Sequence, residues 1–272
     1  MDKGKVFRQL HQGPEILLMP NPWDPGTTKF LASLGFKAMA TSSAGFAFSR
    51  ALPDGGVTFD VMMQHCRDLV GATDLPISGD LEKGKGDSAD SAGETIFAAE
   101  AAGLAGCSIE DFSGDPDKPI YDFAHAVERV AAAAEAARAL KNDFVFTARA
   151  ENFLHGRADL DDTIKRLQAF EKAGADVLFA PGISDLESIR TICASVSKPV
   201  SVLAPASLSV SELKSIGVSR VSLGPRLTTA AFSAIRDAAR EVLDKGTFEF
   251  SKTGVTFGEL QKLYAQDADK ES

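Results

Sequence analysis

Short apolar runs alternate with amphipathic segments along this chain. The apolar runs, each typical of a buried β-strand, lie at residues 15–19, 37–41, 76–81, 107–111, 144–149, 177–180, 200–203 and 220–223. Segments with helical periodicity lie between them, at residues 28–34, 59–70, 91–102, 123–140, 161–173, 186–194 and 208–216. Strands that alternate with helices form a parallel sheet. Eight such units favour closure into a (β/α)8 barrel, which needs about 250 residues, and the chain has 272.

Four glycines support the count of eight strands. Each of them follows alanine, leucine or isoleucine at the end of a helical segment and leads into a strand. They are Gly35, Gly103, Gly174 and Gly217. A glycine in this place commonly ends the helix in the left-handed conformation. These positions precede alternate strands, the second, fourth, sixth and eighth, so the sequence predicts the same turn at every second unit.

Further helices are expected at both ends of the chain. We expect a single barrel domain over residues 1–272, with an N-terminal helix at 1–14 and a C-terminal helical extension at 245–272. A helix at 230–243 would close the eighth unit. The extension carries an amphipathic segment near 257–264 whose apolar face packs on its own barrel or docks on a neighbouring subunit, and the sequence leaves both open.

Composition narrows the class of protein. The net charge of −9 argues against nucleic acid as a partner, because nucleic-acid binding calls for a basic surface. No run of about 18 apolar residues that could span a membrane occurs, and the start has no apolar signal-peptide core. The three cysteines are far apart and odd in number, which implies no disulfide framework. We expect a cytoplasmic protein without a membrane partner.

Charged residues lie where strands are predicted to end. Asp54 follows the second strand, and the next three strands end on Asp80 with Glu82, on Glu110 with Asp111, and on Arg149. The carboxyl ends of all strands meet at one rim of a barrel, where the chemistry of such enzymes takes place. Carboxylates this close repel one another unless a cation is present, and Mg²⁺ prefers oxygen ligands. A guanidinium suits bidentate binding of a carboxylate or phosphate. The rim therefore predicts a divalent cation and an anionic substrate.

Each of these residues also has a structural interpretation. Asp80 and Glu82 could pair with Lys83 or Lys85 on a solvated loop. Arg149 could make a structural salt bridge to Glu110 or Glu151, and Asp111 could be a cap, so Glu110 ranks above it. The small residues Ser42, Ser43, Ala44 and Gly45 could form an anion-binding nest of backbone N–H groups. Among the four histidines, His155 alone falls near a rim loop. No metalloprotease, hydrolase, Walker A or dinucleotide-binding motif is present.

With these residues the chain resembles the isocitrate lyase/phosphoenolpyruvate mutase superfamily. The D-x-D-x-G-x-G motif of that family corresponds to D-L-E-K-G-K-G from Asp80, with the second acid lengthened to Glu82. Its I-E-D motif corresponds to residues 109–111, its A-R ends at Arg149, and the acid after the second strand is Asp54. The similarity runs from N-P-W-D-P-G-T-T-K-F to S-R-V-S-L-G-P-R-L.

The resemblance implies a barrel that forms a homo-oligomer, a dimer or tetramer in which a C-terminal helix is exchanged between neighbours. It implies Mg²⁺, with Mn²⁺ as a possible substitute, held directly by Asp80 and partly through water by Glu82, Glu110 and Asp54. The substrate would be a small anionic 2-oxo or 2-hydroxy carboxylate, bound at the metal, Arg149 and the backbone of Ser42, Ser43 and Ala44. The shared chemistry passes through a pyruvate-like enolate, with Arg149 and Glu110 as catalytic residues.

Positions at which the sequence differs from the motifs of the family reduce the number of reactions that fit. The lyase loop K-K/R-C-G-H is absent, because residues 112–122 read F-S-G-D-P-D-K-P-I-Y-D. Pro181 stands near the place of the lyase glutamate, and the mutase loop K-x-x-x-K-x-N-S is absent as well. A carbon–carbon lyase or oxaloacetate-type decarboxylase fits best, since loss of carbon dioxide needs no cysteine acid. Residues 112–121 would form a lid over the site.

Two alternatives stay open. The first is cleavage or rearrangement of a carbon–phosphorus bond, as in phosphonopyruvate hydrolysis, which would need a phosphonate-binding group such as Lys118 or Arg157. The second is a metabolite-binding protein without catalysis. Retention of the acids and of Arg149 speaks against the second, because a decayed site should have lost some of them.

Overall fold

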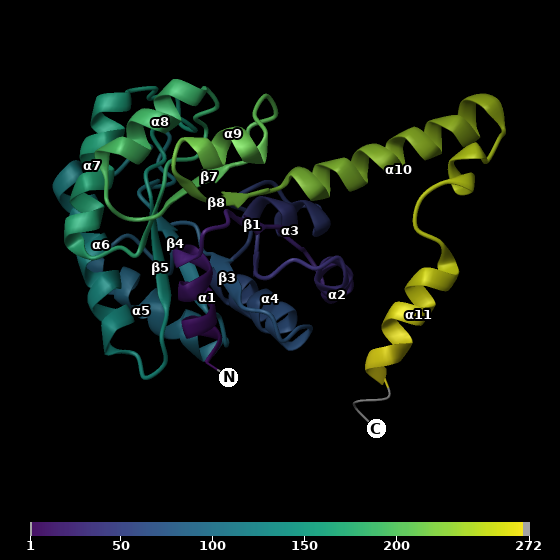
Figure 1. The fold of residues 1–272 in the computed structure, drawn as a ribbon, viewed down its shortest axis with the longest axis horizontal. Helices are drawn as coiled ribbons and strands as arrows, with labels where there is room; N and C mark the ends of the chain where they lie inside the picture. Colours follow the sequence, from purple (N-terminus) through teal and green to yellow (C-terminus); the bar gives the residue numbers. More distant parts are fainter. Residues whose placement is uncertain (1, 269–272) are drawn as a thin grey trace.

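The computed structural model describes residues 2–268 and contains eight parallel strands in one nearly closed barrel (Figure 1). The end of the expected C-terminal extension, 269–272, lies outside the described residues. The strands are β1 (Leu17–Met19), β2 (Met39–Ala40), β3 (Ile77–Asp80), β4 (Gly106–Glu110), β5 (Val145–Arg149), β6 (Val177–Phe179), β7 (Val200–Leu203) and β8 (Val218–Ser222). All eight predicted strands are confirmed, most of them a residue or more shorter than the apolar runs.

Parallel pairing runs around the barrel from β2 through β3 to β8 and on to β1. At the remaining seam, between β1 and β2, the backbone N–H of Ala40 donates to the carbonyl of Pro20 at 3.1 Å. The predicted turns are also confirmed, because Gly35, Gly103, Gly174 and Gly217 all have positive φ. The carboxyl ends of all eight strands therefore form one rim.

The helices cover the outside of the sheet over most of its circumference (Figure 1). They are α1 (Lys3–Gln12), α2 (Pro25–Ser33), α3 (Ser43–Ser49), α4 (Phe59–Gly71), α5 (Ala89–Ala101), α6 (Phe123–Ala139), α7 (Leu160–Ala173), α8 (Leu186–Ser195), α9 (Val210–Ser215), α10 (Arg226–Lys245) and α11 (Phe257–Ala268). The main core lies between strands and helices, and none of the described helices is long and apolar enough to cross a bilayer.

Helix α1 closes the amino end of the barrel. Phe7 on this helix is fully buried and packs in a small core cluster with residues of three strands: Leu17 and Met19 of β1, Val145 of β5 and Val177 of β6. The contact is close, since a Cβ at Gly106 would lie 3.0 Å from the Phe7 ring and 2.4 Å from the carbonyl oxygen of Val145. The interior of the barrel is therefore open only toward the rim.

The last helices do not complete the barrel wall. Helix α10, expected to close the eighth unit, contacts α3 near its start and then projects away from the sheet (Figure 1), and Thr228 is its only buried residue. Helix α11 returns to the same chain, where the Tyr264 hydroxyl donates to the carbonyl of Gly26 on α2 at 3.1 Å. We call α10, α11 and the turn between them the C-terminal arm.

Candidate active site

Three adjacent strands place their last side chains at one point of the rim. Asp80 ends β3, Glu110 ends β4 and Arg149 ends β5. Glu110 and Arg149 are paired in the register of the two strands, and Asp80 lies opposite Ser108, two residues before Glu110. Side chains two residues apart on a strand point to the same face. Because side chains alternate between the two faces of a strand, Asp80, Glu110 and Arg149 all point into the barrel.

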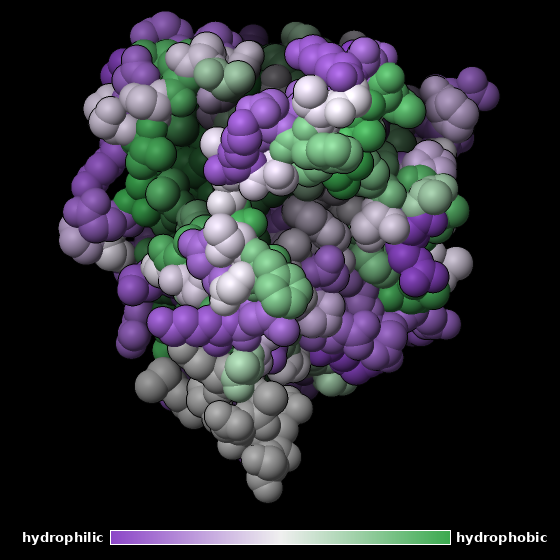
Figure 2. All heavy atoms as spheres, turned by 90° about the vertical axis from the view of Figure 1, so that its right-hand side faces the viewer, coloured by the Kyte–Doolittle hydropathy of each residue, from purple (hydrophilic) through white to green (hydrophobic). Residues whose placement is uncertain are grey.

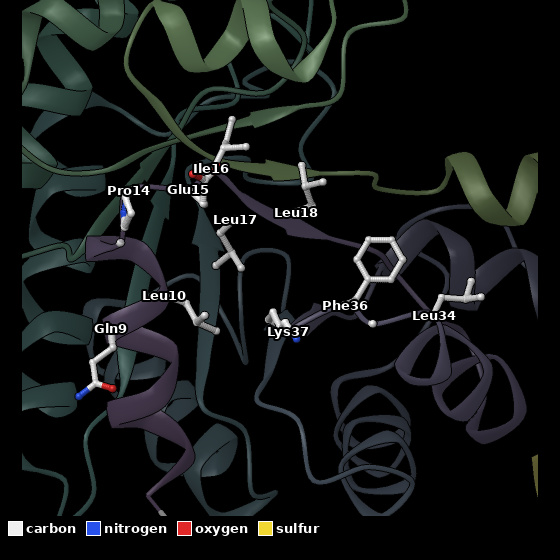
Figure 3. Close-up of a pocket in the computed structure, with 12 residues that line it drawn as sticks. Gln9, Leu10, Pro14, Glu15, Ile16, Leu17, Leu18, Leu34, Phe36 and Lys37 are labelled. Atoms are coloured by element: carbon white, nitrogen blue, oxygen red, sulfur yellow. The ribbon is translucent and has the colours of Figure 1, made fainter.

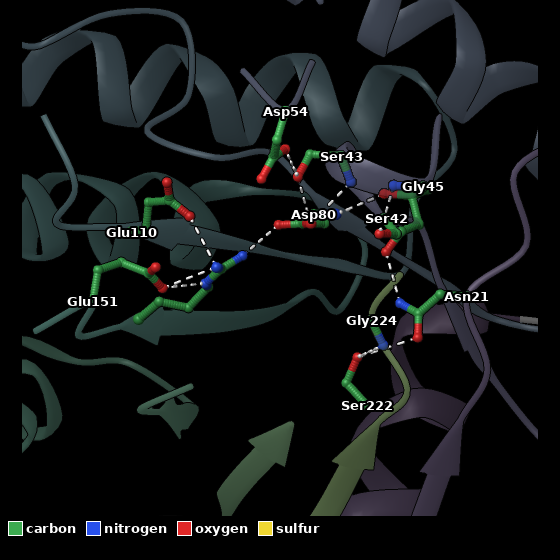
Figure 4. Close-up of polar contacts among 12 residues, drawn as sticks. Asn21, Ser42, Ser43, Gly45, Asp54, Asp80, Glu110, Glu151, Ser222 and Gly224 are labelled. Carbon is green, nitrogen blue, oxygen red and sulfur yellow. Dashed lines mark hydrogen bonds and ion pairs between the residues drawn. The ribbon is translucent and has the colours of Figure 1, made fainter. Parts of the chain in front are cut away.

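Arg149 contacts three carboxylates at the rim, those of Asp80, Glu110 and Glu151, which are labelled in Figure 4. Its Nη1 lies 2.5 Å from Asp80, and its Nη2 lies 3.1 Å from Glu110 and 2.9 Å from Glu151. Nε also donates to Glu151 at 2.9 Å. The structural salt bridges considered for Arg149 are thus both present, and they hold the guanidinium at the mouth of a cavity that it also lines.

The segment expected to form a backbone nest is the start of α3. Ser42 caps this helix, and its hydroxyl oxygen accepts from the N–H of Gly45. The N–H and the hydroxyl of Ser43 both donate to the same oxygen of Asp80, at 3.0 Å each, and the hydroxyl lies 3.4 Å from Asp54. Ser42, Ser43 and Ala44 all line the cavity beneath Asp80, so α3 joins the second-strand loop to the acids.

The loop after β3 holds Glu82 toward the site without a lysine partner. Lys83 donates to Asp87 and to the carbonyl of Ser113, and Lys85 pairs with Glu94. The interpretation of Asp80 and Glu82 as partners of these lysines is therefore wrong. Glu82 itself has φ of +51°, which is unusual for a residue with a side chain.

Arg129 on α6 fixes the backbone of this loop. Its side chain is buried and donates to three carbonyl groups of the loop, those of Lys83, Gly86 and Ser88. The guanidinium also lies over the ring of Tyr121, 4.8 Å from its centroid, and its three bonds to one loop make it a clamp. The clamp maintains the unusual conformation of Glu82, and nothing in the pattern of α6 predicted it.

The charges at the rim are not balanced. Burial and the neighbouring Asp80 and Asp54 raise the pKa of Glu82 to about 7. Burial also raises the pKa of Glu110 well above its usual value, although Arg149 opposes the shift. The pKa of Asp54 is raised by burial and by Asp80. One guanidinium thus faces more carboxylates than it can neutralise.

The donor set fits a hard divalent cation. All candidate ligands are carboxylate oxygens, the type that Mg²⁺ binds while keeping several waters. Within residues 2–268, however, no three Asp, Glu, His or Cys side chains are gathered into a preformed metal cluster. Asp80 and Glu110 are instead held by Arg149. Asp80, Glu82, Glu110 and Asp54 are the residues that would hold Mg²⁺, and its binding there stays a prediction.

Asp111 faces away from the site. Its carboxylate accepts from the N–H of Glu151 at 2.8 Å and from Arg166 on α7 at 3.0 Å. Both charged side chains are about 97–98% buried, and burial raises the pKa of Asp111 to about 6. The ranking of Glu110 above Asp111 follows from strand alternation, because neighbouring residues point to opposite faces.

Two adjoining cavities open at the rim. The outer one, of about 510 Å³, is lined by Asp54, Glu82, Glu110, Arg149 and His155, and we call it the rim cavity. The inner one, of about 240 Å³, reaches into the barrel, and we call it the inner cavity. Its lining residues include Asn21, Ser78, Ser108, Arg220 and Ser222. A small carboxylate fits both in size, and guanidinium groups border them: Arg149 lines both cavities and Arg220 lines the inner one.

The comparisons with known proteins agree with this geometry. Residues 7–243 match the family model described as phosphoenolpyruvate phosphomutase. The chain belongs to the phosphoenolpyruvate phosphomutase family. It therefore lies in the isocitrate lyase/phosphoenolpyruvate mutase superfamily, whose members are lyases and mutases.

Relatives of this family member include both solved structures and curated enzymes. A crystal structure from Burkholderia cenocepacia, assigned as a lyase/mutase, is 48% identical, with a TM-score of 0.94 over 97% of this chain and 96% of that one. The 2-methylisocitrate lyase of Escherichia coli is 32% identical over 72% of this chain and 68% of its own length. Oxaloacetate decarboxylase 2 of Pseudomonas fluorescens is 29% identical over 88% and 84%.

The predicted lid of this family member is a short loop closed by its own hydrogen bonds. Phe112 and Ile120 form an antiparallel bridge, and the N–H of Ser113 donates to the carbonyl of Pro119 at 2.8 Å. The ring of Phe112 stacks on His155 with centroids 3.7 Å apart. The loop thereby lies against the outer edge of the rim cavity, which Phe112 and Gly114 help to line.

Sequence reasoning missed one charged residue of the inner cavity. Arg220 lies in the middle of β8, with 4% of its surface exposed. A signal was present, because a charged residue within an apolar strand run is expensive to bury without a role. His155 was noticed only for its position, whereas Glu151 was predicted as a possible partner of Arg149, and that ion pair is present. Glu151 is almost fully buried, and although burial opposes ionisation, the charge of Arg149 keeps its pKa below the usual value.

A third cavity lies at the other end of the barrel, against its outer face. It has a volume of about 490 Å³ and lies between α1, β1 and the turn after α2 (Figure 3). Its lining residues include the apolar side chains of Leu10, Ile16, Leu18, Leu34 and Phe36. The cavity is apolar, and this family member's charged rim lies at the opposite ends of the strands, so we do not consider it a catalytic site.

Proposed function

We propose that this protein is a Mg²⁺-dependent carbon–carbon lyase, most simply an oxaloacetate-type decarboxylase, acting on a small 2-oxo or 2-hydroxy carboxylate through a pyruvate enolate. The observation that carries the proposal is the buried guanidinium of Arg149 among Asp80, Glu110 and Glu151 at the mouth of a carboxylate-sized cavity. Such a group is already oriented where negative charge develops in the reaction.

The chemistry follows from this arrangement. The bond between carbon 3 of the oxo acid and its distal carboxylate breaks, carbon dioxide leaves, and the electron pair passes into the enolate. Arg149 stabilises the developing oxyanion, and a bound divalent cation would supply Lewis-acid stabilisation at the same place. Water that enters under the loop 112–120 protonates carbon 3. No side chain has to protonate the departing fragment.

The positions of two basic residues favour carbon–carbon over carbon–phosphorus chemistry. A phosphonate group would need a cation in the lid, for which Lys118 and Arg157 were the candidates. Lys118 lines a separate pocket with Asp87 and Tyr121. In the described part of the chain, neither residue is among those lining the rim cavity or the inner cavity. The similarity to an oxaloacetate decarboxylase and to a 2-methylisocitrate lyase also supports a lyase.

The proposal is tested by incubating the purified protein with oxaloacetate and Mg²⁺ and following pyruvate above the metal-only background. We expect turnover that EDTA abolishes and that Arg149→Ala reduces by at least about a hundredfold, the usual effect of removing one oxyanion donor. Arg8→Met is the matched control, because Arg8 also sits in a network of two carboxylates, Asp143 and Asp176, but far from the rim. Absence of turnover above background in the wild type would refute the decarboxylase.

We also propose that the protein is a homo-oligomer, a dimer or tetramer, in which the C-terminal arm packs on a second copy. The apolar residues Phe232, Ile235 and Leu243 lie on one side of α10 and are at least half exposed. Figure 2, viewed from the side of the arm, shows hydrophobic and hydrophilic residues interspersed on this face of the molecule. No residue of α10 lines the apolar cavity between α1, β1 and the turn after α2, and we propose that α10 of a second copy packs there.

The cysteines support a reducing location. Cys66 and Cys107 are buried and free, and burial raises the pKa of the Cys66 thiol to about 12. Neither thiol is needed for the proposed reaction. We therefore propose that the enzyme works in the cytoplasm.

A further inference from the structure

The lining of the inner cavity is charged on one side of the barrel and apolar on the other. In the order of the strands, β6, β7 and β8 lie across the barrel from β2, β3 and β4. The side of β2 to β5 supplies Asp54, Asp80 and Arg149. The opposite side, from the loop after β5 to the loop after β8, supplies Leu154, Phe179, Pro181, Leu203 and Pro225. We call these last five residues the apolar wall.

The apolar wall begins directly beside Arg149. Phe179 ends β6 and is the register partner of Arg149, and the guanidinium lies over its ring, 5.4 Å from the centroid. Phe179 is in turn paired with Ser201 on β7. Leu203 follows Ser201 by two residues, so it points to the same face one layer nearer the rim. The wall is therefore level with the charged groups that it faces.

Two glycines fix the leucines of the wall in place. A Cβ on Gly224 would lie 2.6 Å from Cδ1 of Leu203, and a Cβ on Gly182 would lie 3.0 Å from Cδ2 of Leu154. Each leucine therefore packs directly on a stretch of backbone that has no side chain. Phe179 is only 7% exposed. The wall is thus a preformed apolar surface.

The charge on this side of the barrel lies deeper than the wall. From β6 to the end of the described chain, Arg220 is the one charged residue that lines the inner cavity. It is paired in register with Ser201, one layer below Leu203, and donates to the hydroxyls of Ser201 and Thr147. Burial and Arg149 lower the pKa of Arg220 to about 10, and the negative charge of Asp80 opposes this shift. A charged group of a substrate placed against the wall would lose its hydration without gaining a partner.

We propose that the substrate carries an alkyl group on carbon 3 and that the apolar wall binds this group. The inference rests on the proposed function, in which the carboxylate and oxo group that remain on the product lie at the charged side, beside Arg149 and the start of α3. Carbon 3 then points across the cavity, with its alkyl group against the wall and its leaving carboxylate toward the rim cavity. The substrate class is a 2-oxo dicarboxylate with an alkyl substituent on carbon 3, and loss of carbon dioxide gives a 2-oxo acid longer than pyruvate.

The test is equilibrium binding of three product-like acids, pyruvate, 2-oxobutanoate and 2-oxopentanoate, measured by calorimetry in Mg²⁺. The acids share the oxo and carboxylate groups and differ by one methylene at each step. We expect the Kd of the wild type to fall about fourfold with each methylene, the effect of burying that group on an apolar surface. Equal Kd values for the three acids, or no binding of any of them, would overturn the proposal.

Variants of the wall show whether it causes this trend. Leu203→Asn places an amide of similar size in the wall and should reduce the gain per methylene to less than about twofold, whereas Leu203→Met should retain the gain. Should Leu203→Asn fail to fold, Leu154→Asn takes its place, because Leu154 is 46% exposed on a loop. Val210→Asn is the matched control, since Val210 is 41% exposed and lines neither cavity.

The ratio of the Kd values separates binding by the wall from a structural role. A variant that is merely less well folded binds all three acids less tightly and keeps their ratio, whereas loss of the apolar contact changes the ratio itself. A wild-type ratio in the folded Asn variant of the wall would overturn the proposal.

Failure of this inference and failure of the proposed function give different results. Oxaloacetate turnover by the wild type together with equal Kd values for the three acids rejects the alkyl site and keeps the decarboxylase. A Kd that falls along the series in the wild type but not in Leu203→Asn, without any turnover of oxaloacetate, keeps the alkyl site and rejects the decarboxylase.

Discussion

The buried ion pair behind the rim allows a quantitative prediction about stability. Asp111 and Arg166 are each at most 3% exposed, and their charged atoms are 3.0 Å apart. Asp111→Asn keeps the shape and can still accept from the N–H of Glu151, but it removes the charge. Arg166 then keeps only Asp162, at 2.8 Å, and the carbonyl of Tyr121.

Breaking one partner of a buried pair typically costs about 3–5 kcal/mol. Since Asp162 still pairs with Arg166, we expect the lower value, about 3 kcal/mol, for Asp111→Asn. For a chain of this size that corresponds to a fall in Tm of roughly 6–12 °C. Asp162→Asn is the matched control. Asp162 is 26% exposed, so its loss should cost only about 1 kcal/mol.

The assay is urea unfolding at neutral pH of the two single variants, Arg166→Met and the double variant Asp111→Asn/Arg166→Met. The double variant should lose less stability than the sum of its singles by about 0.5–3 kcal/mol, because the two residues share one interaction. Pyruvate formation per folded molecule should stay near wild type, because neither side chain faces the cavity. An Asp111→Asn protein as stable as Asp162→Asn would refute the reasoning.

Two further predictions concern acid stability and assembly. Burial lowers the pKa of His65 to about 4 and that of His11 to about 3; since both values lie below the unfolded value of 6.5, the stabilisation is complete above pH 6.5 and is lost as the pH falls. Between pH 7 and pH 5, His65→Gln should therefore lose about 2 kcal/mol less stability than wild type in urea unfolding. Carboxylates with a raised pKa, such as Glu82 and Asp111, change the stability in the opposite direction but equally in both proteins, so equal pH slopes would contradict the prediction. For assembly, Ile235→Glu should convert the oligomer to smaller species in light scattering, whereas Arg236→Glu, on the same helix, should not; a wild-type monomer would reject the exchange of α10.

The strands and the positions of the rim acids were predictable because both follow from local rules. A buried parallel strand needs an uninterrupted apolar run. A charged residue at the end of such a strand is costly to bury in the core, so it lies at the rim. Glu110 and Arg149 illustrate this, since strand alternation alone aims both inward. The four glycines were predictable for a similar reason, because a helix that turns directly into a strand needs a left-handed residue.

The remaining features depend on contacts that no local pattern encodes. The clamp by Arg129 joins α6 to the loop after β3, more than 40 residues earlier in the chain. The departure of α10 from the barrel is a matter of packing, because its amphipathic pattern fits its own barrel and a neighbour equally well. Arg220, a charge within an apolar run, was a signal of some role, but the run alone does not show whether the side chain faces the interior of the barrel or its outer surface.

The helix that closes the amino end of the barrel has a kinetic consequence. Phe7 and α1 close the amino end, so the interior opens only at the rim. A product fragment in the inner cavity can therefore leave only after a fragment in the rim cavity, nearer the loop 112–120, has left. Fragments formed from one substrate would therefore depart in a fixed sequence, the outer before the inner. An added inner fragment should compete directly with fresh substrate, whereas an added outer one should not, so the depth of a closed barrel determines the inhibition pattern of the enzyme.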